Sequence, residues 1–109
     1  MTRRARFGRT RESDPVNVRR ITMDVDKAVR QPDILELAEA IDSVSGVAAL
    51  NITVGNIDIE TVGMDITVEG DAIDVPALLA AVEHSGAAVH SIDEVVVGSH
   101  IVELVQRKR

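Results

Sequence analysis

Acidic side chains are the residues of this chain whose spacing could support chemistry. Asp24 and Asp26 lie in a segment that alternates like a strand, so their carboxylates project from one face. A second pair, Asp93 and Glu94, lies in the last apolar segment, which we expect to neighbour the first strand. Carboxylate oxygens are the ligands that Ca²⁺ and Mg²⁺ prefer. The sequence predicts either a divalent-cation site of these four residues, with further ligands supplied by a subunit contact, or solvated carboxylates of an acidic protein.

The three histidines form no catalytic or metal-binding pattern. His84, His90 and His100 lack the HExxH spacing, and His84 falls at the end of an expected helix, where a cation is favoured. The chain has no cysteine, which excludes thiolate metal sites and cysteine nucleophiles. No serine lies in a nucleophile elbow. We therefore expect a protein that is not an enzyme and that has no cofactor unless it binds Ca²⁺ or Mg²⁺.

Charge divides the chain into an acidic centre and two basic ends. Residues 17–106 carry a net charge of −12, whereas residues 1–16 and 107–109 each carry +3. An acidic surface repels nucleic acid, so we expect nucleic acid as a partner only of the Arg-rich residues 1–16. The acidic excess also fits a protein that works in concentrated salt, where self-repulsion is screened.

The two ends are expected to lie outside one folded domain, residues 17–105. Residues 1–16 show neither a helical nor a strand period, which indicates a disordered basic tail. Two alternatives are an arm that contacts nucleic acid or an acidic neighbour, and an extension translated upstream of the natural start. Residues 106–109 form a basic C-terminal end. No apolar run approaches the roughly 20 residues that span a membrane, and no secretory signal follows the N-terminus, so we expect a cytoplasmic protein without a membrane partner.

Hydrophobic periodicity within this domain predicts four strands and two helices. Asp33 and Glu36 have capping-box spacing at the start of the first helix, and Asp74 is placed to cap the second. The expected order is a strand at 17–26, a helix at 33–44, a strand at 47–60 with a bulge at Gly55-Asn56, a turn at 61–63, a strand at 64–69, a helix from 74 to 86 and a strand at 87–98.

The last strand breaks its own alternation. Val89 and Ile92 are both apolar but out of phase, so we expect a bulge at Ser91–Asp93 that presents Asp93 and Glu94 outward. The run Val95–Val97 that follows is expected to be buried.

This order of elements is that of an α+β, ferredoxin-like βαββαβ fold. It has a four-stranded antiparallel sheet with both helices on one face, and its first and third strands are central. The other face is predicted to be polar without aromatic side chains, which argues against base stacking on RNA. The first loop lacks the CxxC of soft-metal chaperones.

Several ordered segments carry a resemblance to a known family. VRRITMDV, LAEAIDSVSGV, NITV, IDIET, DITVEG and above all VHSIDEVVVG are similar to an archaeal family catalogued as domain of unknown function 211. The resemblance covers about residues 17–103 and leaves the Arg-rich N-terminus outside. It implies a ferredoxin-like fold and assembly into homo-oligomers, and it supplies no catalytic residues.

The sequence thus favours a self-assembling binding or structural module without catalytic activity. Pairing between copies is expected through the sheet edges or the apolar residues 101–105, because an exposed strand edge is a template for pairing. The alternative is a regulatory domain that binds a divalent cation or a small metabolite.

Overall fold

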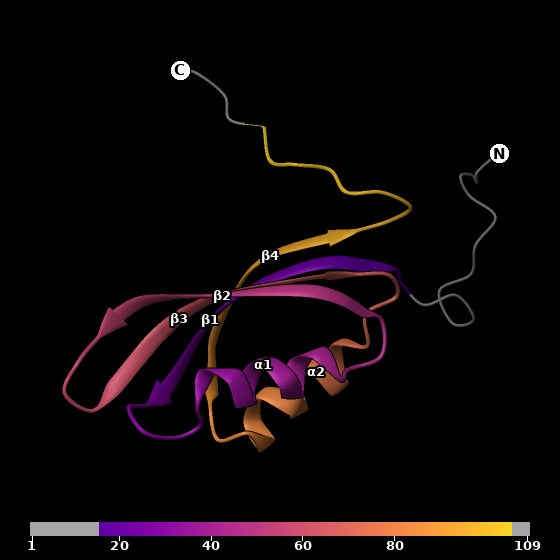
Figure 1. Ribbon diagram of the computed structural model, residues 1–109. Coiled ribbons are helices and arrows are strands. Elements are labelled where there is room, and N and C mark those ends of the chain that lie inside the picture. Colours follow the sequence, from indigo (N-terminus) through magenta and orange to yellow (C-terminus); the bar gives the residue numbers. More distant parts are fainter. Residues whose placement is uncertain (1–15, 106–109) are drawn as a thin grey trace, which may run out of the picture.

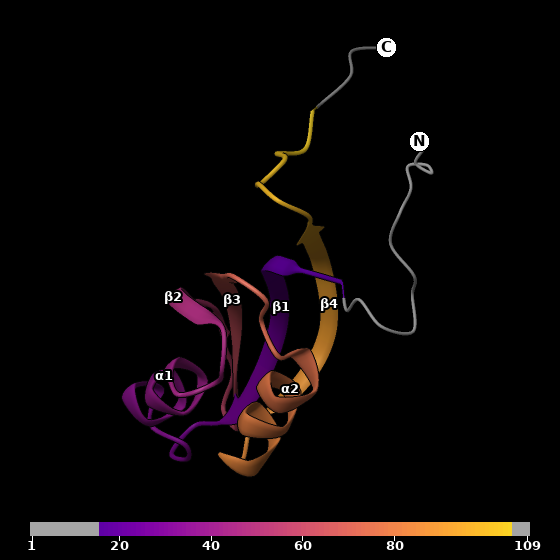
Figure 2. The same ribbon diagram turned by 90° about the vertical axis from the view of Figure 1, so that its right-hand side faces the viewer.

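The computed structural model describes residues 16–105 and consists of one antiparallel sheet with two helices packed on one face (Figures 1 and 2). The strand order is β2-β3-β1-β4, so the first and third strands are central as predicted. This is the ferredoxin-like α+β fold. The elements are β1 (Val18–Ala28), α1 (Ile34–Asp42), β2 (Val47–Ile57), β3 (Thr61–Gly70), α2 (Val75–His84) and β4 (Ala88–Val97).

Residues 1–15 and 106–109 lie outside the described part of the chain, and with them the predictions of a disordered N-terminal tail and a basic C-terminal end. Neither helix in residues 16–105 is long and apolar enough to cross a membrane.

The core lies between the two central strands and the helices. Alternate residues of β1 and β3 are buried, and they meet Leu37 and Ile41 of α1 and Leu78 and Val82 of α2. Each such side chain contributes roughly 1.5–3 kcal/mol by leaving water. The buried strand residues are Ile21, Met23, Val25, Val62, Met64, Ile66 and Val68.

Both helices begin at the predicted aspartates. The backbone N–H of Leu35 donates to Asp33 Oδ1 over 3.3 Å, and the N–H of Asp33 donates to Glu36 Oε1 over 3.1 Å, which completes the capping box. At α2 the N–H of Ala77 donates to Asp74 Oδ1 over 3.1 Å.

The prediction of a turn at residues 61–63 is wrong, because β3 begins at Thr61. The chain reverses instead before Thr61, where the N–H of Asp58 donates to the Thr61 carbonyl over 2.8 Å. The physical reason is that Val62 is in phase with Met64 and is buried in the core, so the strand period extends back past Gly63.

The bulges of the two edge strands follow the predicted phase breaks. In β2 the pairing with β3 shifts between Val54 and Asn56, as expected from Gly55. In β4 the pairing passes from Glu94 to Ile92, so Asp93 has no partner residue on β1. A further shift between Ser91 and Val89 was not predicted.

The predicted burial of the whole run Val95–Val97 is wrong. Val96 is 6% exposed, but Val95 and Val97 are 53% and 45% exposed. The reason is that strand alternation places Val95 and Val97 on the opposite face of the edge strand β4 from Val96, so cover on one face cannot bury all three.

Two turns at one end of the sheet are in backbone contact through glycine. The N–H of Asp71 donates to the Gly46 carbonyl over 2.9 Å, and the N–H of Asp74 donates to the Ser45 carbonyl over 3.0 Å. A Cβ on Gly70 would overlap the Gly46 carbonyl. Gly70 therefore allows the turn after α1 to seat against the turn before α2.

Replacement of Gly70 tests this contact. We expect Gly70→Ala to lower the free energy of unfolding by roughly 1–3 kcal/mol, because two packed backbones must separate. The matched control is Gly55→Ala, whose Cβ would meet Asp65 Oδ2 at an ordinary 3.6 Å, and its effect should stay within about 0.5 kcal/mol. Urea denaturation measures both. Equal stability of the two variants would contradict the role of Gly70 in the contact between the two turns.

Candidate functional site: the open face of the sheet

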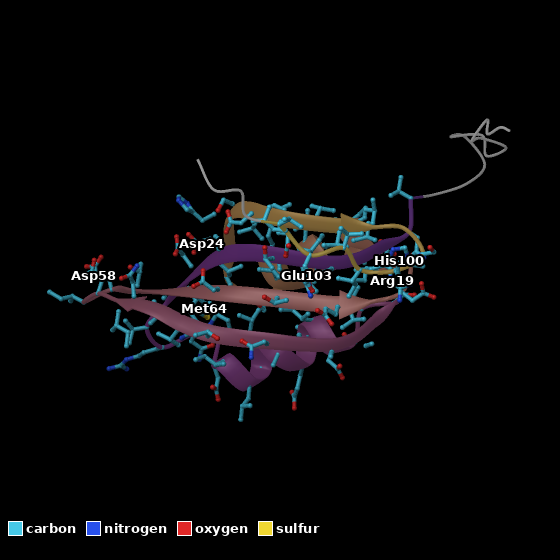
Figure 3. All side chains as sticks on the ribbon, turned by 90° about the horizontal axis from the view of Figure 1, so that it is seen from above. Arg19, Asp24, Asp58, Met64, His100 and Glu103 are labelled. Carbon is cyan, nitrogen blue, oxygen red and sulfur yellow. The ribbon has the colours of Figure 1, made fainter. Side chains whose placement is uncertain are left out.

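The face of the sheet opposite the helices is open and polar, and it presents two distinct regions (Figure 3). One end, marked by Asp24 and Asp58, is rich in carboxylates. Glu103 lies toward the other end, where Arg19 and His100 are found. We call the first region the acidic hollow and the second the Arg20 cluster.

The acidic hollow is a depression of about 480 Å³ whose lining includes Asp24, Asp26, Asp58, Asp65 and His90. Asp24 of β1 lies directly opposite Asp65 of β3, and like charges in that position repel.

The floor of the hollow contains two glycines, which leave room for carboxylates. Asp65 Oδ2 is 3.6 Å from where a Cβ of Gly55 would lie, and Asp26 Oδ1 is 3.5 Å from where a Cβ of Gly63 would lie. The carboxylates of Asp26 and Asp65 are therefore set against backbone that has no side chain of its own.

Within residues 16–105 no ion pair reaches Asp24, Asp26 or Asp65. Nor does any group of three or more acidic or histidine side chains in this part of the chain have the geometry to hold a metal ion. The hollow thus concentrates negative charge without a completed coordination shell.

The structure separates the four residues predicted as cation ligands. Asp24 and Asp26 line the acidic hollow, but Asp93 and Glu94 do not. Asp93 Oδ1 accepts a hydrogen bond from Ser91 Oγ over 2.8 Å, and Glu94 Oε1 is 3.6 Å from Arg20 Nη1. The four-residue site stays a prediction, since it would need ligands from a second copy to be completed.

The Arg20 cluster joins three strands to the segment that follows β4. Arg20 Nε donates to Glu69 Oε2 of β3 over 2.9 Å. Its Nη1 and Nη2 donate to Glu103 Oε1 and Oε2, each over 2.9 Å, in a two-pronged contact. The hydrogen bonds that Arg20 donates hold the pKa of the Glu103 carboxyl below its ordinary value, and its hydrogen bonds to the carboxylates of Glu103 and Glu69 raise the pKa of Arg20. Arg20 is thus the cation on which Glu69, Glu94 and Glu103 converge.

Large apolar side chains are exposed at the margins of the sheet. Three of them lie in β4 and are each 45–53% exposed; we call these three residues, Ile92, Val95 and Val97, the β4 edge row. The segment after β4 adds Val102, Leu104 and Val105, which are 63–77% exposed. At the end of the β2–β3 hairpin the exposed side chains are Val54 and Ile57 of β2 and Ile59 of the turn. Exposed apolar groups gathered at strand edges are typical of surfaces that contact another molecule.

Comparison with known proteins confirms the family resemblance found in the sequence. Residues 19–109 match the model of the family described as "Uncharacterized ArCR", domain of unknown function 211. The chain belongs to this family. A relative from the archaeon Methanocaldococcus jannaschii, itself described as uncharacterized, is 39% identical over 89 residues, which cover 82% of this chain and 91% of the relative. Family membership assigns no residue a role, so the open face must be interpreted from its own geometry.

The repulsion across the acidic hollow can be measured. We expect Asp65→Asn to raise the free energy of unfolding by roughly 0.2–1 kcal/mol in dilute buffer, because it removes a like charge opposite Asp24. The gain should shrink at about 1 M salt, where screening acts over about 3 Å. The control is Glu39→Gln on the exposed surface of α1, which makes the same change in net charge. An equal gain from both variants would assign the effect to overall charge and not to the hollow.

Proposed function

We propose that this member of the domain of unknown function 211 family is a non-catalytic module that assembles with copies of itself through the margins of its sheet. The observation that carries the proposal is the β4 edge row, with Ile92, Val95 and Val97 about half exposed on a strand whose outer backbone has no partner within the described chain. A second copy of the same chain would cover both the apolar side chains and the free backbone groups.

The sequence of β4 supports this reading. Proteins that keep an edge strand from pairing place lysine, proline or bulges on it. The β4 sequence AVHSIDEVVV contains no lysine, arginine or proline. Its bulges come before Glu94, so the apolar stretch that remains for contact is Val95–Val97.

Charge sets the conditions for assembly. Each copy carries −12 over residues 17–106, so copies repel one another in dilute buffer. Salt screens this repulsion and leaves apolar contacts intact, or strengthens them when the anion is sulfate or phosphate. Assembly through apolar margins should therefore increase with ionic strength.

Sedimentation velocity tests the proposal. We expect oligomers of the intact protein whose share grows with protein concentration and with salt. Val95→Lys in the β4 edge row should raise the dissociation constant about tenfold or more, because a charge would have to leave water. The control is Leu35→Lys, since Leu35 is 71% exposed on α1 and away from the sheet margins. A monomer at every concentration and salt level would refute the proposal.

The second candidate function is binding of a divalent cation, or of a small metabolite with positive charge, in the acidic hollow. It is favoured by the pair Asp24 and Asp65, which face each other without a cation among the described side chains. A bound cation would offset their repulsion and accept their oxygens as ligands.

Calorimetry with Ca²⁺ and with Mg²⁺ distinguishes the possible sites. Binding that is lost in Asp24→Asn but kept in Asp93→Asn would place the cation in the hollow. Loss in both variants would support the predicted site of Asp24, Asp26, Asp93 and Glu94. No heat with either metal on the intact protein would remove metal binding as a function.

A further inference from the structure

We propose that the segment after β4, residues 99–105, is an arm that crosses to a second copy and places its Glu103 on the Arg20 of that copy. The inference rests on the self-assembly proposed above and names its contact. The two-pronged pairing of Arg20 with Glu103 within one chain shows which groups match, and in the oligomer the same match forms between chains.

Arg20 is built to receive a carboxylate. Its side chain is 15% exposed, and Glu69 Oε2 orients it from 2.9 Å at Nε and 2.8 Å at Nη2. Nη1 and Nη2 each also donate to the carboxylate of a further acid, Glu103, over 2.9 Å. Among the open-face residues of β1 and β3, namely Arg20, Thr22, Asp24, Asp26, Gly63, Asp65, Thr67 and Glu69, it is the only basic one. An acidic chain of the same kind can therefore dock its glutamate at this point of the face and be repelled elsewhere.

The arm has exposed apolar side chains and, within the described part of its own chain, unpaired backbone groups. It contains neither helix nor strand, and it makes no backbone hydrogen bond to the rest of the described residues. Val102, Leu104 and Val105 are 63%, 76% and 77% exposed. Figures 1 and 2 show the arm reversing after β4 and then rising away from the sheet. An ion pair at a surface contributes little against the entropy lost on ordering seven residues, so the apolar side chains need a surface that their own chain does not provide.

The junction before the arm allows it to change direction. Gly98 has a φ of +119°, and a Cβ built there would meet nothing within 4 Å. Its N–H donates to the Asn17 carbonyl over 2.9 Å, which anchors the end of β4. From this anchor five extended residues reach about 16 Å, or roughly three strand spacings, which is enough to carry Glu103 onto an adjoining sheet. Exchange of a terminal segment is a known low-cost route to oligomers.

Two shortened chains test whether the arm contributes to assembly. A chain ending at Gly98 should show a dissociation constant at least about tenfold higher than the intact protein in sedimentation velocity. The matched control ends at Val105 and removes only the basic end, and it should assemble like the intact protein. Equal assembly of both shortened chains would overturn the proposed role of the arm but would not contradict the proposed function. A monomeric intact protein would instead refute the proposed function.

A charge swap distinguishes exchange from a contact within one chain. Glu103→Arg and Arg20→Glu should each weaken assembly when studied alone. Mixed in equal amounts they should recover it, because the arm of each variant then meets an opposite charge on the other. A contact within one chain cannot be restored by mixing, so failure to recover, with both variants folded by circular dichroism, would overturn the exchange.

Arg20→Glu brings four glutamates together and can fail to fold. Because the chain has no cysteine, a second measurement is available. A Val102→Cys chain mixed with a size-tagged Thr22→Cys chain should form a joined pair with a short bis-maleimide, since Thr22 is the next open-face residue after Arg20 on β1. No joined pair at concentrations where the intact protein assembles would overturn the exchange.

Discussion

The pairing register of β1 with β3 is the constraint on which both faces of the molecule depend. It sets Met23 against Ile66 and Val25 against Met64 on the side of the helices, where all four are buried. A slip of either strand by one residue would turn the buried side chains of that strand toward water, so the hydrophobic core holds the register strongly. The same register fixes the pairs on the open face, so Asp24 lies opposite Asp65 because the core requires that pairing. The acidic hollow is thus electrostatically unfavourable in itself and is maintained by packing on the other side of the sheet.

Local signals in the sequence were sufficient to predict the helix caps and a bulge, but not which side chains from different elements come into contact. The caps at Asp33 and Asp74 and the bulge at Asp93 depend on a few neighbouring residues, and each was predicted correctly. The face opposite the helices was expected to be polar, but the position of Asp65 opposite Asp24 follows from the register between two strands. The convergence of Glu69, Glu94 and Glu103 on Arg20 needs, in addition, the course of the chain after β4. The exposure of Val95 was missed because coverage of an edge strand depends on where α2 lies as well as on strand period.

The basic residues of β1 are placed so that they leave the acidic hollow without a counter-charge. Arg19 donates to Asp71, and Arg20 is held by glutamates at the other end of the open face. Lys27 lies on the helix side, 6% exposed, and its ammonium donates to the carbonyls of Ala28 and Val29 over 3.1 Å each. Since these three side chains are already engaged, carboxylates are paired with a cation at one end of the open face and, within residues 16–105, have no paired cation at the other. A carboxylate of an acidic partner, and a second copy is one, would find an opposite charge on this face at Arg20.

The strong negative charge and the apolar margins of this protein act together and not against each other. At about 1 M salt the screening length falls to about 3 Å, so copies that repel in dilute solution can approach to contact distance. At that distance a direct hydrogen-bonded pair such as Arg20 with Glu103 is screened much less than charges that are far apart, and burial of Val95 and Leu104 is not weakened at all. In the proposed assembly, long-range charge would decide whether copies meet, apolar burial would supply the attraction, and Arg20 would determine the orientation. A chain with the same apolar margins but without the acidic surface would be prone to pair by any exposed edge.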